Sequence, residues 1–192
     1  MVHGQTSSVG QTLVLISGLP ASGKTTLARS VASASRLPLL SLDVVKESLH
    51  DSLALTDRAL LRAAAWRVIC SLLPDFPHGA LVELWIDPSR DREALRRDLG
   101  RFPASRVVEI MCVVPGDEAA RRYADRPRNY GGHLPPDEAV LARIRRSAAL
   151  MEPLGLGPAL QVDTTRPVAV ESIVEWIDRH TPLGSVSRRL PT

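Results

Sequence analysis

The sequence contains little cysteine, and this shortage excludes whole classes of site. Only two of its 192 residues are cysteine, Cys70 and Cys112, and both lie in apolar segments. We therefore expect two reduced, buried thiols in a cytoplasmic protein, rather than a disulfide or a metal site. The five histidines are scattered along the chain, which also argues against a zinc site.

Long apolar runs are missing as well. No run approaches the ~20 residues that a membrane span needs, and the polar residues 1–8 contain neither the charged nor the apolar region of a secretory signal. We therefore expect a cytoplasmic protein without a membrane partner. The length of 192 residues and the hydrophobic content of 44% predict a single globular domain.

Lysine and aromatic residues are also scarce. The basic residues are 22 arginines and only two lysines, Lys24 and Lys46, and the net charge is only +3. So small a charge does not indicate nucleic-acid binding. Three Trp, two Tyr and two Phe provide few platforms on which bases could stack. A nucleic-acid partner is therefore less favoured than a small molecule.

One motif is present in full. Residues 18–25, GLPASGKT, match the phosphate-binding pattern G-x-x-x-x-G-K-[ST]. Gly18 and Gly23 permit backbone angles that turn successive N–H groups around a phosphate. Lys24 places a positive charge at the β- and γ-phosphates, and the Thr25 hydroxyl is suited to bind Mg²⁺. The pattern predicts contacts with a nucleoside triphosphate from Gly18, Pro20, Ala21, Ser22, Gly23, Lys24, Thr25 and Thr26.

Strand-like and helix-like segments alternate along the chain. Strands are expected at residues 12–17, 37–42, 80–86, 106–114 and 160–163, and helices at 26–32, 57–73, 90–99, 137–151 and 168–180. This alternation predicts an α/β fold with a five-stranded parallel sheet and helices on both faces. The domain should span residues 12–180, between a flexible N-terminus (1–11) and a mobile C-terminal tail (181–192).

Acidic residues follow the second and third strands, where open parallel sheets bind ligands. Asp43 could accept a proton from an attacking hydroxyl group, or cap the helix that follows it; the two roles are compatible. Glu83 could hold Mg²⁺ through water, orient a substrate, or form a structural hydrogen bond to the phosphate loop. Asp87 is an alternative metal ligand. Trp85 either stacks on a ring-bearing substrate or fills the core.

An arginine segment follows the fourth strand. Arg122 and Arg126 are four residues apart, so on a helix they would share one face; Pro127 should end that helix, and Arg128 follows. The planar fork of arginine grips phosphate oxygens. The alternative is a solvated helix face that pairs with the nearby acids Asp117, Glu118 and Asp125.

Taken together, these segments resemble the P-loop kinases of the nucleoside-monophosphate-kinase fold. The resemblance is to the branch that phosphorylates hydroxyl groups, which includes chloramphenicol phosphotransferase, zeta toxins and polynucleotide 5′-kinases. It rests on residues 18–25, on Ser41–Lys46, on the arginine segment and on Asp163–Pro167. The chain departs from this family at Lys46, where arginine is frequent, and at its third strand, which often ends in a clear Asp.

The resemblance implies a P-loop NTPase fold with an arginine-bearing lid at about residues 117–135, and it implies ATP and Mg²⁺ as cofactors. Asp43 would be the base, Arg122 would lie near the adenine and the α- and β-phosphates, and Arg126 or Arg128 near the transferred group. The implied catalytic set is Asp43, Lys24, Arg126 and Arg122. The implied adenine contacts are Thr165, Arg166 and Pro167, and the implied substrate contacts are Asp43, Lys46, Glu83, Trp85, Arg128 and His133.

These features predict an ATP-dependent kinase that phosphorylates a hydroxyl group of a small molecule, such as an antibiotic, a sugar or a nucleoside-like metabolite. A GTPase is disfavoured because the chain lacks the N-K-x-D and D-x-x-G patterns. Two alternatives stay open: a polynucleotide 5′-hydroxyl kinase, and a nucleotide-binding regulatory or toxin-type protein. The acceptor and the oligomeric state are not determined by the sequence.

Overall fold

The structure is a computed structural model that describes residues 11–101, 106–126 and 134–181. Residues 1–10 and 182–192, for which we expected flexible ends, lie outside the described residues. The same holds for Arg128 and His133, and for residues 127–133 of the expected lid.

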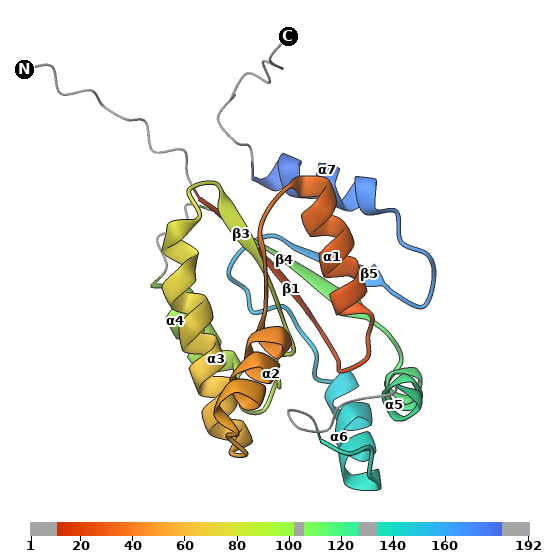
Figure 1. Ribbon diagram of the computed structural model, residues 1–192. Coiled ribbons are helices and arrows are strands. Elements are labelled where there is room, and N and C mark those ends of the chain that lie inside the picture. Colours follow the sequence, from red (N-terminus) through yellow and green to blue (C-terminus); the bar gives the residue numbers. More distant parts are fainter. Residues whose placement is uncertain (1–10, 102–105, 127–133, 182–192) are drawn as a thin grey trace, which may run out of the picture.

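A five-stranded parallel sheet forms the centre of the molecule (Figure 1). Its order is β2-β3-β1-β4-β5, which places β1 between β3 and β4. The expected α/β architecture is therefore confirmed. The strands are β1 (Thr12–Gly18), β2 (Leu39–Ser41), β3 (Gly79–Leu84), β4 (Arg106–Val113) and β5 (Ala159–Asp163).

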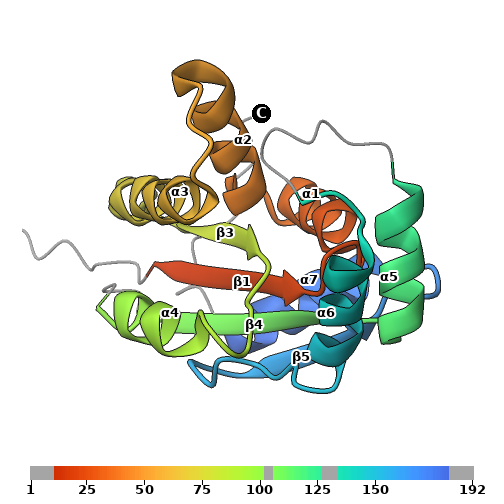
Figure 2. The same cartoon turned by 90° about the horizontal axis from the view of Figure 1, so that it is seen from below.

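Helices cover both faces of the sheet (Figure 2). The helices α1 (Lys24–Ser35) and α7 (Val170–His180) pack on the face that Val14 and Ile16 present. The helices α3 (Arg58–Leu72) and α4 (Arg92–Leu99) pack on the opposite face, against Leu13 and Leu15. Because side chains alternate between the faces of a strand, a strand buried on both faces is an unbroken apolar run. The run from Thr12 to Ser17 was predicted as a strand for this reason.

Three helices lie beyond the carboxyl ends of the strands: α2 (Leu42–Leu53), α5 (Gly116–Asp125) and α6 (Glu138–Ala148) (Figures 1 and 2). Helices α5 and α6 pack through Tyr123 and Ile144, which are both buried. A short 3₁₀ helix, Leu73–Asp75, extends α3. These helices surround the sheet edge at which ligands of this architecture bind.

Some predicted boundaries were wrong. The second strand is shorter than expected, because α2 already begins at Leu42, and the third strand ends at Leu84 rather than at residue 86. Helix α5 ends at Asp125, so Arg126 has an extended backbone and does not share a helical face with Arg122. Pro127 explains this end, because proline disfavours helical angles in the residue before it.

Candidate active site

At Gly18, the loop between β1 and α1 lies too close to neighbouring atoms for a larger residue to fit. A Cβ atom on Gly18 would lie 2.5 Å from Ser22 Oγ and 2.9 Å from Cys112 Cβ. Gly23 has a φ of 82° and immediately precedes α1, a left-handed conformation that glycine adopts at little cost. The loop therefore presents backbone N–H groups at the N-terminus of a helix, which is an anion-binding geometry.

Four side chains connect this loop to the neighbouring strands. Thr25 Oγ1 donates to Glu83 Oε1 over 3.1 Å, and Ser41 Oγ donates to Glu83 Oε2 over 2.5 Å. Lys24 Nζ lies 3.7 Å from Glu83 Oε1 and 3.4 Å from Leu19 O. Glu83 is only 1% exposed, so its buried charge is satisfied by one cation and two hydroxyl groups.

The donors near Thr25 fit a magnesium ion that is shared with bound phosphates. Mg²⁺ is usually held by one or two protein oxygens, by water and by substrate phosphates, and Thr25 Oγ1 and Glu83 supply such a pair. The Ser22 hydroxyl is buried and has no hydrogen-bond partner among the residues that the structure describes, as expected in a loop built around a polar ligand. Among the described residues, no group of three His, Cys, Asp or Glu could hold a metal ion by itself.

Asp43 lies in the first turn of α2, and the N-cap of that helix is Ser41. The interpretation of Asp43 as the N-cap is therefore wrong by two positions. Its carboxylate accepts a hydrogen bond of 2.7 Å from Lys46 Nζ, and the Asp43 side chain is 40% exposed. A carboxylate in a first helical turn is stabilised by the helix dipole, and this one remains accessible to a ligand.

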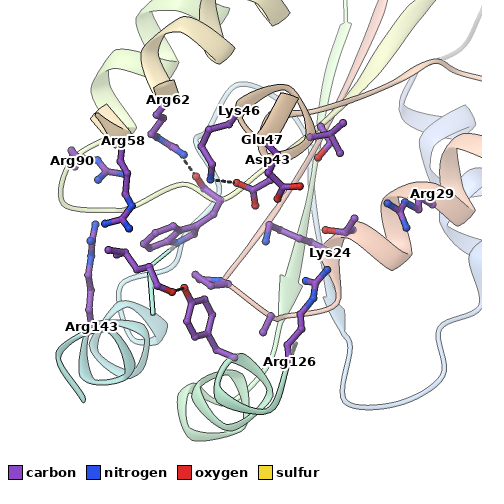
Figure 3. Close-up of a pocket in the computed structure, with 18 of the residues that line it drawn as sticks. Lys24, Arg29, Asp43, Lys46, Glu47, Arg58, Arg62, Arg90, Arg126 and Arg143 are labelled. Carbon is purple, nitrogen blue, oxygen red and sulfur yellow. Dashed lines mark hydrogen bonds and ion pairs between the residues drawn. The ribbon is translucent and has the colours of Figure 1, made fainter. Parts of the chain in front are cut away.

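A cleft of about 410 Å³ joins Asp43 to the phosphate loop (Figure 3). Lys24, Thr25, Asp43, Lys46 and Trp85 all line it, so the structure brings together five of the residues that the sequence singled out. In the part of the chain that the structure describes, eight basic side chains line the cleft: Lys24, Arg29, Lys46, Arg58, Arg62, Arg90, Arg126 and Arg143. Its acidic lining residues are Asp43, Glu47 and Asp51.

Two buried acids hold three of these arginines in place. Asp87, 2% exposed, is paired with Arg143 Nη2, and Asp91 Oδ2 accepts from Arg62 Nη2 over 2.6 Å. Arg90 Nε donates to Asp91 Oδ1 over 2.7 Å. Burial acts to raise the pKa of Asp87, but hydrogen bonds from Arg143 and Ser89 outweigh it and hold the pKa below its ordinary value. Asp87 thus pairs with an arginine instead of approaching the phosphate loop.

Trp85 forms part of the cleft wall and is only half-buried. The Arg143 guanidinium carbon lies 5.1 Å from its ring centroid, within cation–π range. The Trp85 carbonyl oxygen accepts from Arg62 Nη2 over 2.7 Å. The ring thus lines the cleft, and its stacking on a ring-bearing substrate stays a prediction.

Helix α5 borders a second cleft of about 480 Å³ beside the phosphate loop. Arg122 and Arg126 both line it, and Arg126 also lines the first cleft. Arg122 Nε donates to Glu118 Oε1 over 2.7 Å, and Arg122 Nη1 donates to Thr164 O over 3.3 Å. Hydrogen bonds from Arg121 and Arg122 lower the pKa of Glu118 to about 2. Arginines of α5 therefore pair with a nearby acid, as the alternative interpretation expected, but Arg122 lies beside the phosphate loop rather than on a helix face away from it.

The turn after β5 contacts the phosphate loop through one residue. Thr164 Oγ1 donates to Ser22 O over 2.6 Å. Thr165 instead bonds within its own turn, where its N and Oγ1 both donate to Asp163 Oδ1. Neither cleft is lined by Thr165, Arg166 or Pro167. For these three residues, contact with the adenine stays a prediction.

Four arginines of the cleft were not predicted from the sequence: Arg58, Arg62, Arg90 and Arg143. They come from α3, from the segment after β3 and from α6. In a chain with 22 arginines, no local pattern distinguishes Arg90 and Arg143 from the others. The i, i+4 spacing of Arg58 and Arg62 was a usable signal, because it places both side chains on one face of a helix.

The parallel sheet and the phosphate loop, whose Lys24 and Thr25 contact Glu83 of β3, define a P-loop protein of the kinase type. A family model described as an AAA domain (AAA_33) matches residues 13–151, and the chain belongs to this family. The chain is 29% identical to a candidate kinase from Chloroflexus aurantiacus J-10-fl, with a TM-score of 0.74 over 89% of this chain and 98% of that one.

More distant solved structures share the fold. A sugar kinase from Janibacter sp. HTCC2649 is 19% identical, with a TM-score of 0.58 over 91% of this chain and 96% of that one. A shikimate kinase from Acinetobacter baumannii, in complex with shikimate, is 16% identical, with a TM-score of 0.56 over 94% and 97%. No curated protein matches the chain. In the part of the chain that the structure describes, no helix is long and apolar enough to cross a membrane.

Proposed function

We propose that this protein is a kinase that transfers the γ-phosphate of ATP to a hydroxyl group of a small molecule, within the hydroxyl-phosphorylating branch of its fold. One observation carries the proposal. Lys24 and Thr25 of the phosphate loop line the same cleft as the half-exposed carboxylate of Asp43. A protein that only binds nucleotide has no need of a proton acceptor next to the phosphates.

The chain's own residues then divide the work of phosphoryl transfer. Backbone N–H groups of residues 18–25 and the Lys24 ammonium hold the phosphates. Thr25, together with Glu83 acting through water, would hold Mg²⁺, which neutralises charge on the β- and γ-phosphates when it is bound. Lys46 holds the Asp43 carboxylate at 2.7 Å and keeps it oriented toward the cleft.

Asp43 accepts the proton of the acceptor hydroxyl in this mechanism. The hydroxyl oxygen forms a bond to the γ-phosphorus while the bond from that phosphorus to the bridging oxygen of the β-phosphate breaks, so that ADP leaves. A carboxylate is a sufficient base because the transition state is loose. Arg126 and Arg122 would stabilise the phosphates as part of a lid at about residues 117–135 in a domain that spans 12–180.

Release of ADP from ATP and Mg²⁺ tests this function. The acceptors are offered as separate pools of antibiotics, neutral sugars, nucleosides, sugar acids, sugar phosphates and a 5′-hydroxyl oligonucleotide. We expect at least one small-molecule pool to raise ADP release above the rate with ATP alone. Lys24→Ala should abolish that release and weaken ATP binding in calorimetry, because it removes the charge at the β- and γ-phosphates.

Two outcomes would contradict the proposal. Transfer to the oligonucleotide alone would establish a polynucleotide 5′-hydroxyl kinase. Tight ATP binding with no stimulation by any pool would favour a nucleotide-binding regulatory protein. Equal ATP affinity of the wild type and Lys24→Ala would remove the role given to Lys24.

A further inference from the structure

Four arginines converge in the first cleft, the one that Asp43 lines. They lie at the end of this cleft that is farther from the phosphate loop. Arg58 and Arg62 come from α3, Arg90 from the segment between β3 and α4, and Arg143 from α6. Figure 3 shows these four on one side of the cleft, and Lys24, Arg29 and Arg126 on the other, with Asp43 and Lys46 between the two groups. We call these four residues the arginine cluster.

The acids in contact with the arginine cluster do not balance its charge. Arg62 and Arg90 share the single carboxylate of Asp91, and Arg143 is paired with Asp87. Among the described residues, these three guanidinium groups thus meet two carboxylates, which leaves an excess of one positive charge. Guanidinium groups stay charged at every pH that matters for activity. The cluster therefore presents a lasting positive charge to the cleft.

The arginine cluster also has donors left for a ligand. A guanidinium group has five N–H donors in a fixed fork. Among the described residues, the hydrogen bonds of Arg62 and of Arg143 use only the Nη2 atom of each. The acids fix the direction of these side chains, so little conformational entropy would be lost on binding. Such preordered forks suit the two oxygens of a carboxylate or a phosphate.

We propose that the phosphate acceptor is a small hydroxyl compound that carries an anionic group, and that the arginine cluster binds this group. The inference rests on the proposed kinase function, whose acceptor it describes. An anion held by the cluster directs the rest of the molecule toward Asp43, which lies between the cluster and Lys24 (Figure 3). Trp85, beside Arg143, supplies an apolar wall for the carbon skeleton. A cleft of about 410 Å³ is of the size that small ligands fill.

Direct binding tests the anion site without requiring the true acceptor. The protein is saturated with Mg²⁺ and a non-hydrolysable ATP analogue, which fills the phosphate loop, and is then titrated with inorganic phosphate, with D-gluconate and with neutral D-glucose. We expect at least one anion, and not glucose, to bind. Arg58→Gln should weaken that binding about tenfold, and so should Arg143→Lys, which keeps a charge opposite Asp87 but loses the fork. Arg179→Gln on α7, outside both clefts, is the matched control.

Measurements of turnover distinguish this inference from the proposed kinase function on which it rests. With sugar acids and sugar phosphates compared against their neutral counterparts, we expect the anionic members to be phosphorylated. Arg58→Gln should then raise the KM for the acceptor about tenfold and leave kcat and the KM for ATP nearly unchanged. Turnover of neutral compounds alone, or equal anion affinity in the wild type and Arg58→Gln, would overturn the inference while the kinase stands. Anion binding lost in Arg58→Gln, with no turnover of any compound, would support the anion site and contradict the kinase.

Discussion

At the scale of single residues, two buried glutamates show how the position within a sheet determines a role. Glu83 in β3 pairs with Ile16 of β1, and Glu109 in β4 pairs with Leu15 of the same strand. Because successive side chains point to opposite faces, Glu83 reaches Thr25 and Ser41. Glu109 instead accepts from the backbone N–H groups of Leu154 and Leu156. One acid thus belongs to the site and the other holds a connecting segment.

The first prediction at this scale concerns Asp43. Asp43→Asn should lower the rate of phosphotransfer on the order of 10²–10⁴-fold, because an amide cannot accept the proton of the attacking hydroxyl. ATP affinity should stay close to that of the wild type, since Asp43 is not part of the phosphate loop. The rate is measured with the true acceptor, and ATP binding by calorimetry on the same preparation.

Thermal unfolding of Asp43→Asn provides the control. Asparagine keeps the shape of the side chain, and the N-cap of α2 is Ser41, so the Tm should change little. Full activity of the variant would remove Asp43 as the base. A large fall in Tm together with lost activity would show that Asp43 supports the fold of α2 instead.

At the scale of elements, α5 connects the phosphate loop to the turn after β5. Arg122 bonds both to Glu118 on its own helix and to the carbonyl of Thr164, and Thr164 in turn bonds to Ser22 of the loop. Arg126, one residue past the helix end, is exposed and lines both clefts. The two arginines therefore differ: Arg122 is held by these partners, whereas no partner of Arg126 is found among the described residues.

This difference predicts different kinetic effects for the two arginines. Arg126→Ala should lower kcat more than it weakens ATP binding, because a side chain that closes over the transferred phosphate acts mainly in the transition state. Arg122→Ala should weaken ATP binding as well, since Arg122 lies beside the loop. Single-turnover rates and ATP titrations of both variants measure this. Unchanged single-turnover rates in both would show that α5 is only a solvated helix.

At the scale of the whole molecule, side chains from distant segments hold the walls of the cleft together. Asp87 follows β3 and is paired with Arg143 on α6, while Asp91 is paired with Arg62 on α3. Burial favours protonation of both acids, but hydrogen bonds from Arg143 to Asp87 and from Arg90 to Asp91, with the charge of Arg62, hold both pKa values below the ordinary value. The stability of the fold is thereby coupled to pH.

The sign of that coupling follows from the lowered pKa values. Below about pH 5 the unfolded chain binds more protons at these acids than the folded chain does, so the free energy of unfolding decreases as the pH falls. The contribution of Asp87 is complete above its unfolded pKa, near 3.8, and is lost as the pH falls through the lower folded value. Asp87→Asn should cost about 1–3 kcal/mol at pH 7 and reduce the slope below pH 5. Urea unfolding at pH 7, 5 and 3 measures both effects, and parallel pH curves for the two proteins would contradict the assignment.

Features of the fold were predictable where they depend on residues that are close together in the sequence. The buried strand before the phosphate loop and the glycines of the loop were predicted correctly. A strand that is covered by helices on both faces is apolar throughout, and a left-handed turn needs glycine. The end of the second strand was predicted wrongly, because Leu39, Leu40 and Leu42 are apolar and favour one continuous strand, whereas in the structure Leu42 is the first residue of α2. For Trp85 the sequence left two roles open, because a large apolar side chain next to a strand can either fill the core or face a ligand.

By itself, the sequence determined the class of fold, the phosphate loop with Lys24 and Thr25, and the carboxylate that follows β2. These features depend on residues close together in the chain, whose backbone preferences and apolar periodicity act over a few positions. Only the tertiary structure decided that Glu83 faces the loop while Glu109 does not, that Asp87 is paired with Arg143, and that four arginines from three segments meet in one cleft. The physical reason is that strand order and register determine which faces meet, and both arise from packing over the whole chain rather than from any local pattern.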